Sequence, residues 1–352
     1  MTKLEQIIKQ IKSLDKNILK SAQKRLDSLT KPLGSLGRLE ELAKQIAGIT
    51  WNMKPTITDK TIVLMAGDHG VASEGVSAYP QEVTAQMVLN ILGGGAAINV
   101  LSRHIGAKLV VVDMGVASDI PFHSELLVKK IGKGTANMTY GPAMSYNDAL
   151  RAIETGIEIA ESEAEKGTDI IATGEMGIAN TTPSSAIAAV LTGSPVEVVT
   201  GRGTGIDDKR RSKKIAVIEK SIEANKPDSK DSVDVLAKIG GFEIGGLAGV
   251  ILGAAGKKIP VVIDGFISSA AALIAAAIAP AVKEYMIASH CSVEPGHKLI
   301  LEYMGLKPLL SLDMRLGEGS GAALGINLAE TAVKIFNEMA TFGEAGVSEK
   351  AD

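Results

Sequence analysis

A carboxylate between two glycines, near the end of the chain, has a setting that suits general base chemistry. Glu318 stands between Gly317 and Gly319, follows an apolar lead-in at Met314 and Leu316, and precedes a run of small residues. Glycine permits positive φ and the close approach of a ligand. A poorly solvated carboxylate has a raised pKa, which brings it toward the range useful to a base. The alternative is that Glu318 caps the next helix, where an anion is favoured in any protein.

Residues 174–183 form a first glycine-rich loop between a predicted strand and a predicted helix. Thr182 and Pro183 fit the N-cap and first position of that helix. Free backbone N–H groups at a helix N-terminus bind anions, most often phosphate. The loop is therefore either a phosphate site or an ordinary capped turn, and its candidate binding residues are Glu175, Gly177 and Asn180.

Residues 201–208 form a second glycine-rich loop, which a basic run follows at 209–214. Its backbone amides, with Gly203 at their centre and a lysine behind, could complete a phosphate clamp. The alternative for the basic run is a solvated helix face. The loop lacks the third glycine of a dinucleotide fingerprint, because Ile206 takes that place.

Two other groups of reactive side chains favour structural roles. Residues 290–297 resemble a metal cluster by residue type, but their spacing matches no zinc pattern and a Pro-Gly turn interrupts them. Asp68 and His69 could form an acid–base pair, although adjacent side chains at the end of a strand usually point apart. We therefore expect no metal and no cofactor.

The composition limits the class of protein. The 352 residues are 45% hydrophobic but only 3% aromatic, with 38 glycines, which suits close packing of helices on a sheet. The net charge of -3 argues against nucleic acid or an anionic membrane as the partner. One cysteine, Cys291, and an N-terminus without an apolar signal core indicate the cytoplasm. The alanine-rich segment 266–282, the only one near transmembrane length, is expected to be a buried helix.

Short apolar runs alternate with helical stretches through most of the chain. The runs lack polar alternation, as expected for strands of a parallel sheet buried on both faces. The predicted strands are 61–66, 108–113, 169–173, 196–199, 259–263 and 284–288, and the predicted crossover helices are 80–92, 143–166, 183–191 and 247–255. Ligands bind beyond the carboxyl ends of such strands, where polar residues and glycines gather here. The sequence thus predicts a Rossmann-like α/β fold.

Helical periodicity at both chain ends predicts a second, smaller domain. Apolar spacing marks a helix over 4–29, either continuous or broken once, another over 36–49 and a last one over 326–339. We expect residues 1–55 plus 325–352 to form a small helical domain and residues 56–324 the large α/β domain. The tail after Phe342 is expected to be frayed.

Taken in order, these segments resemble one family: the nicotinate-nucleotide–dimethylbenzimidazole phosphoribosyltransferases of cobalamin synthesis. The resemblance covers nearly the whole chain and rests on these ordered motifs: residues 31–40, 66–71, 77–80, 83–87, 93–99, 289–297 and 315–322, with both glycine-rich loops. It implies transfer of phosphoribose from nicotinate mononucleotide to 5,6-dimethylbenzimidazole, with inversion at C1′, giving α-ribazole 5′-phosphate and nicotinate. It also implies a homodimer.

The resemblance also assigns roles to individual residues. Glu318 matches the catalytic base, Glu175 and Gly177 match the substrate-site turn, and Lys214 matches the phosphate lysine. Ser77 and Gln86 fall in segments that line the benzimidazole pocket, for which Met87 and Leu316 offer apolar surface.

Two positions depart from the family pattern. Ala179 stands where the family usually has glycine, and its methyl group could crowd the phosphate. Arg210 and Arg211 stand where the family tends to have Gly and Leu, which leaves open whether Lys213 or Lys214 contacts the phosphate.

Other functions are compatible with parts of the sequence. The acceptor could be another base, or the protein could be a nucleotide sensor that keeps the phosphate loops without catalysis. An NAD-dependent oxidoreductase would need a fingerprint that residues 67–70 do not supply. A phosphoribosyl-pyrophosphate-dependent transferase would need paired acids before its phosphate loop, whereas Asp207 and Asp208 follow it.

Overall fold

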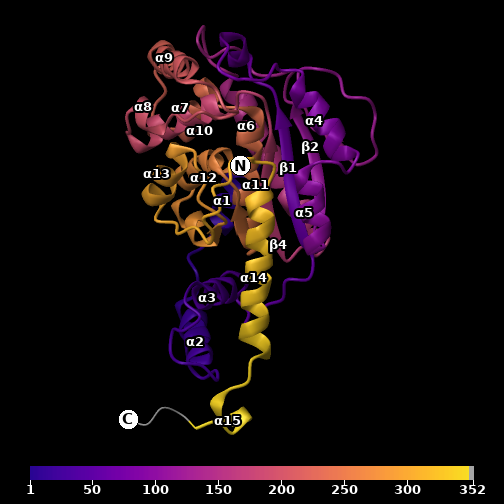
Figure 1. Ribbon diagram of the computed structural model, residues 1–352, viewed down its shortest axis with the longest axis vertical. Helices are drawn as coiled ribbons and strands as arrows, with labels where there is room; N and C mark the ends of the chain where they lie inside the picture. The colour runs from indigo at the N-terminus through magenta and orange to yellow at the C-terminus, as the bar shows by residue number, and fades with distance from the viewer. Residues whose placement is uncertain (349–352) are drawn as a thin grey trace.

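A six-stranded parallel sheet forms the centre of the computed structural model, which describes residues 1–348 (Figure 1). Its strands are β1 (Lys60–Gly67), β2 (Lys108–Gly115), β3 (Leu126–Val128), β4 (Ile170–Met176), β5 (Val261–Ile263) and β6 (Met286–Ala288). Their order is β3-β2-β1-β4-β5-β6, and every pairing is parallel. The predicted α/β fold is confirmed.

Helices cover both faces of the sheet. One face carries α4 (Val83–Leu92), α5 (Ala97–Ile105) and α14 (Ser320–Glu338), and the other carries α6 (Tyr146–Glu165), α11 (Phe242–Gly256) and α12 (Phe266–Ile278). Successive residues of a strand point to opposite faces. Accordingly, Ile62 and Leu64 of β1 belong to the core under α14, whereas Val63 and Met65 belong to the core under α11. This double burial explains the continuous apolar runs.

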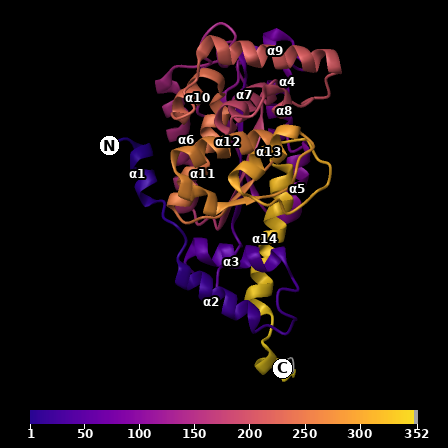
Figure 2. The same ribbon diagram turned by 90° about the vertical axis from the view of Figure 1, so that its left-hand side faces the viewer.

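The helices at the chain ends lie beyond the amino-terminal edge of the sheet. Of the two forms expected for the first helix, the broken one is present, since α1 (Lys3–Gln10) and α2 (Lys16–Asp27) are separate. Helices α2, α3 (Arg38–Thr50) and the far end of α14 lie together below the sheet in Figure 1, and Figure 2 shows the same grouping. In contrast, α1 packs on α6 and α11 of the large domain. The domain boundaries stay a prediction; α14 runs through residue 325 without interruption, and residues 349–352 lie outside the described residues.

Two predictions of secondary structure were wrong. Residues 196–199 form a helical turn, α8 (Val196–Val199), because Pro195 starts it and the Thr200 hydroxyl closes it by donating to Val196 O at 2.7 Å. The tail after Phe342, expected to be frayed, begins with a short helix, α15 (Phe342–Ala345), which Thr341 and Glu344 cap reciprocally, while its residues 349–352 lie outside the described residues. Strand β3 was missed because it has three residues, two of which are exposed.

The apolar segment 266–282 is a core element, as expected, but it divides into α12 and a 3-10 helix, η2 (Pro280–Tyr285). The prediction that 266–282 is the only segment near transmembrane length was wrong. Residues 83–105 are also long and apolar enough to cross a membrane by length and composition alone. That stretch consists of α4 and α5, which a turn at Gly93–Ala96 separates.

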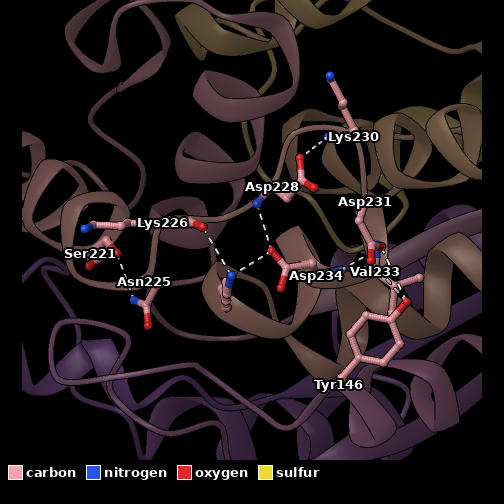
Figure 3. A network of polar contacts seen from close by, with 10 residues as sticks. Tyr146, Ser221, Asn225, Lys226, Asp228, Lys230, Asp231, Val233 and Asp234 are labelled. Carbon is pink, nitrogen blue, oxygen red and sulfur yellow. Dashed lines mark hydrogen bonds and ion pairs between the residues drawn. The ribbon is translucent and has the colours of Figure 1, made fainter.

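A polar network anchors the carboxyl end of α9 (Asp208–Asn225), the helix that carries Lys214 (Figure 3). Lys238 donates to the backbone oxygen of Lys226 at 3.2 Å and pairs with Asp234 at 2.9 Å. Both Lys238 and Asp234 belong to α10 (Ser232–Ile239), whose N-cap, Asp231, also accepts a hydrogen bond from Tyr146 of α6. The basic helix is thereby tied to the rest of the α/β domain.

Candidate active site

A cavity of about 500 Å³ opens at the carboxyl ends of β1 and β4. These neighbouring strands lie where the strand order reverses, which is the usual ligand position in an open parallel sheet. Its walls come from the turn after β4, the loop before α14, the second glycine-rich loop and α4. The sequence predicted this edge of the sheet.

The turn between β4 and α7 (Thr181–Thr192) brings Glu175, Gly177 and Asn180 to the cavity wall. Gly177 has no room for a side chain, because a Cβ atom there would lie 2.4 Å from Gly67 O. The predicted helix start was wrong by two residues: Asn180 is the N-cap, and Thr182 and Pro183 lie inside the first turn. The Asn180 side chain makes no capping hydrogen bond and donates its amide to Glu175.

Glu175 is buried at this turn and is neutral near pH 7. Burial, and next the charge of Asp264, raise the pKa of the Glu175 carboxyl to about 8, while the hydrogen bond from Asn180 opposes the rise. A carboxyl group with this pKa is mostly protonated at neutral pH. Glu175 can therefore offer an O–H donor to a ligand without adding a negative charge to the cavity.

Glu318 reaches the same cavity from a loop of left-handed backbone. Its φ is 62°, between 84° at Gly317 and 89° at Gly319, a conformation that is costly for a residue with a Cβ atom. The loop is held by Asp264, which follows β5 and accepts hydrogen bonds from Gly319 N at 3.1 Å and Ala322 N at 2.9 Å. Asp264 also marks the start of α14 by satisfying its free N–H groups.

The Glu318 carboxyl group is suited to accept a proton. It is buried and accepts one long hydrogen bond, 3.4 Å, from Ile98 N in the first turn of α5. Burial raises the pKa of this carboxyl above its ordinary value, the Ile98 N–H opposes the rise, and the charge of Asp264 adds to it. The predicted loss of solvation around Glu318 is present.

A buried lysine stands behind another part of the cavity wall. Lys214 is fully buried and donates to Thr181 Oγ1 at 2.6 Å. Burial lowers the pKa of Lys214 to about 8, against the charge of Glu294, which raises it. Lys213, one residue earlier, is exposed. Only Lys214 of the two stands behind Thr181, a residue of the cavity wall.

The second glycine-rich loop lies beside Lys214 but is already bound to an acid. Gly203 N donates to Glu294 Oε1 at 2.8 Å, and Arg315 donates to Gly203 O at 3.1 Å. The expectation of a free amide at Gly203 is therefore not met, because this N–H has a carboxylate partner. The loop still forms part of the wall through Gly203 and Thr204.

Comparison with known proteins assigns the chain to a family. A family model described as phosphoribosyltransferase matches residues 11–347. Nicotinate-nucleotide–dimethylbenzimidazole phosphoribosyltransferases of Roseiflexus sp. (strain RS-1) and Chloroflexus aggregans are 58% and 59% identical, over the full length of both chains. The chain belongs to this family. The crystal structure of the Thermus thermophilus member superimposes with a TM-score of 0.91 at 42% identity, covering 96% of this chain and 100% of that one.

The predicted residues of this family member fall into three groups by position. Six of them line the cavity: Glu175, Gly177, Asn180, Gly203, Leu316 and Glu318. Lys214 stands behind the wall, and Ser77 lies at the rim, where its hydroxyl is 3.2 Å from Thr204 Oγ1. Gln86 is exposed on α4 and is not part of the wall, whereas Val83 and Met87 of the same helix are.

Several residues of the site were not among the predicted ones. Asp264 and Glu294 organise the two loops, and Arg315, Tyr79 and Ile267 add to the wall. The position of Asp264 directly after a strand was a usable signal, because polar residues at carboxyl strand ends face this edge. Glu294 had no such signal, since its partner Gly203 is 91 residues away.

The remaining polar groups have structural partners. Asp68 accepts from Ala117 N at 2.8 Å and His69 lies 2.8 Å from Glu243, so the two side chains point apart as expected. His297 accepts from Ser292 N at 2.9 Å. Within residues 1–348 there is no group of three or more His, Cys, Asp or Glu side chains placed to hold a metal ion.

Proposed function

We propose that Glu318 is the general base in the transfer of phosphoribose from nicotinate mononucleotide to 5,6-dimethylbenzimidazole, the reaction that makes the cobalamin lower ligand. The observation that carries this assignment is a buried carboxylate held at φ 62° on the wall of a cavity that a buried lysine also backs, through Thr181. Strain of this kind persists where the surrounding structure enforces it, as at functional sites.

The chemistry needs one base and little else. Nicotinate leaves a pyridinium N-glycosidic bond as a neutral ring nitrogen, so its departure requires little acid catalysis. As one benzimidazole nitrogen attacks C1′, the other must lose its proton, and the raised pKa of Glu318 suits it to take that proton. Attack opposite the leaving group inverts C1′ and gives the α-riboside.

Lys214, with Thr181 and the first turn of α7, is our candidate for the phosphate end of the donor. The buried ammonium group and free N–H groups of a helix N-terminus both favour an anion. The neutral Glu175 adds no repulsion there. Val83, Met87 and Leu316 supply apolar surface for the flat acceptor in the cavity that Glu318 also lines.

The site argues against the sensor and is compatible with other flat acceptors. A sensor has no use for a strained carboxylate at the apolar end of the cavity. A different flat base as acceptor would use the same groups, because hydrophobic pockets discriminate weakly between acceptors of similar shape. We further propose that the enzyme acts in the cytoplasm as a homodimer; light scattering on the purified protein tests the dimer.

The test is product analysis. The purified protein is incubated with nicotinate mononucleotide and dimethylbenzimidazole, and the products are followed by chromatography and mass spectrometry. We expect α-ribazole 5′-phosphate and nicotinate in equal amounts. Nicotinate without a riboside would point to another acceptor, and donor binding without any product would favour the sensor.

A further inference from the structure

Thr84 is a buried hydroxyl that the proposed chemistry does not use. It lies on α4, has no exposed surface, and accepts a hydrogen bond from Ile178 N at 3.0 Å. Ile178 belongs to the turn after β4, 94 positions further along the chain. One side chain thus joins two elements that both line the cavity.

The two joined elements hold different substrates under the proposed function. On α4, Val83 precedes Thr84 and Met87 follows it by one turn, and both line the apolar slot. On the turn, Ile178 stands between Gly177 and Ala179, which line the cavity on the way to Thr181. The Thr84–Ile178 hydrogen bond therefore sets the distance between the acceptor wall and the donor turn.

The turn needs such a restraint. Ala179 has a φ of 73°, which is unfavourable for a residue with a Cβ atom. The N–H of Ile178 is the backbone donor just before that position, and without Thr84 it would be buried and unpaired. A buried donor without a partner is costly, so the turn would be driven to move.

Asp68 lies beside Thr84. Burial raises the pKa of the Asp68 carboxyl above its ordinary value, while the Ala117 N–H and the Thr84 hydroxyl act in the opposite direction. The oxygen of Thr84 accepts the hydrogen bond from Ile178 N. Asp68 is itself fixed at the end of β1 by its hydrogen bond from Ala117.

We propose that Thr84 is a positioning residue. It fixes the position of α4, which holds the acceptor, relative to the turn after β4, which holds the donor, so that C1′ is attacked by benzimidazole and not by water. The inference rests on the proposed function. It concerns how the departure of nicotinate is coupled to the attack by benzimidazole. If this relative position is lost, water attacks C1′, nicotinate leaves, and ribose 5-phosphate and a proton are formed. The expected signature is nicotinate release in excess of α-ribazole phosphate.

The experiment compares Thr84→Val with Thr84→Ser and with a matched control, Thr61→Val. Thr61 is equally buried and shares a 2.9 Å hydrogen bond with Thr168, but it lies at the amino end of β1, away from the cavity. For each variant, riboside formed, nicotinate released and ribose 5-phosphate formed are measured at saturating substrates, together with the thermal unfolding midpoint.

We expect Thr84→Val to slow transfer by roughly 10- to 100-fold, because small misplacements of reacting groups have effects of that size. Its ratio of riboside to nicotinate should fall clearly below that of the wild type. Thr84→Ser and Thr61→Val should keep the wild-type ratio, even though Thr61→Val lowers the unfolding midpoint as much as Thr84→Val does.

The proposal is overturned if Thr84→Val keeps the wild-type ratio, or if Thr84→Ser loses it as Thr84→Val does. Should Thr84→Val not fold, Thr84→Cys replaces it, since a thiol is a weaker acceptor of similar size; an unchanged ratio then overturns the proposal equally. The wild type distinguishes failure of the role of Thr84 from failure of the proposed function. If the wild type forms no riboside, the proposed reaction itself is contradicted.

Discussion

Gly317 lies directly against the carboxyl group of Glu175, so that a Cβ atom on Gly317 would be 2.2 Å from Glu175 Oε1. This contact joins the loop that carries the proposed base to the turn that carries the neutral acid. It also gives Gly317 a second reason to be glycine, besides its φ of 84°.

Replacing Gly317 by alanine should damage the site more than the fold. The substitution should cost about 1–2 kcal/mol of stability for the positive φ alone. It should also push Glu175 aside and lower turnover at least tenfold. Gly305→Ala is the matched control, since Gly305 has a φ of 73° and nothing within 4 Å of its Cβ position. Equal turnover in the two variants would show that the contact with Glu175 has no role.

Glu318→Gln should abolish most of the turnover and keep donor binding. The amide preserves the size of the side chain and its hydrogen bond from Ile98, but it cannot take a proton, and loss of a general base lowers rates by about 10²–10⁴-fold. Product formation and calorimetric binding of nicotinate mononucleotide are the measurements. Glu302→Gln, an exposed change on α13 (Pro295–Met304), should leave both unchanged. Full turnover in Glu318→Gln would remove Glu318 from the mechanism.

Five of the six sheet strands could be predicted because each is an apolar run buried on both faces, as Ile62, Val63, Leu64 and Met65 show. Residues 196–199 are also rich in valine, like the strands, but they form a helical turn. Their outcome was decided by local bonds from neighbouring residues, which composition does not encode.

The site was predictable where a short motif carries it and not where distant segments meet. Glu175 and Glu318 stand in motifs that are visible in the sequence. Asp264 acts on Gly319, 55 positions later, and Thr84 acts on Ile178, 94 positions later. Such pairs are formed by the register of the strands and by helix packing, so a single sequence does not reveal them.

Lys214 and Lys213 can be distinguished by substitution. Lys214→Met should raise the KM for nicotinate mononucleotide at least tenfold, whereas Lys213→Met should change it little, because Lys213 is exposed. A buried charge-assisted contact is worth about 1.5–3 kcal/mol, which corresponds to that change. A larger effect from Lys213→Met would reverse the assignment.

A pH series on the wild type and Lys214→Met is the second measurement of the same assignment. Burial places the pKa of Lys214 at about 8, so the ammonium group loses its charge as pH rises through 8. The donor KM of the wild type should therefore increase as pH rises through this value. Lys214→Met should show a smaller increase, which remains because Glu175 gains its negative charge over the same pH range. An increase equal to that of the wild type would show that Lys214 does not contribute.

Glu175→Gln should stabilise the protein at high pH and not at low pH. The pKa of the Glu175 carboxyl is raised from 4.5 to about 8, so the folded state binds the proton more tightly than the unfolded state does. Its stabilising contribution is present below pH 4.5 and is lost as pH rises toward 8.

An amide at position 175 avoids this loss, and the gain at about pH 8.5 should be on the order of 1–3 kcal/mol. Unfolding midpoints of the wild type and Glu175→Gln, at about pH 5 and about pH 8.5, provide the measurement. A difference that is the same at both pH values would show that ionisation of Glu175 does not contribute.

Ala179→Gly should stabilise the turn that precedes α7. Ala179 has a φ of 73°, a backbone conformation that suits the glycine expected here from the family pattern. Left-handed backbone costs a non-glycine residue about 1–2 kcal/mol, and glycine loses about 0.5–1 kcal/mol through its freer unfolded state. The net gain should be up to about 1.5 kcal/mol, seen as a higher unfolding midpoint. The donor KM should stay equal or fall, since Ala179 lines the cavity and its methyl group is removed.

Two outcomes would contradict this prediction. A lower midpoint would show that packing of the Ala179 methyl group contributes more stability than the positive φ costs. A higher KM would show that the methyl group helps to hold the donor.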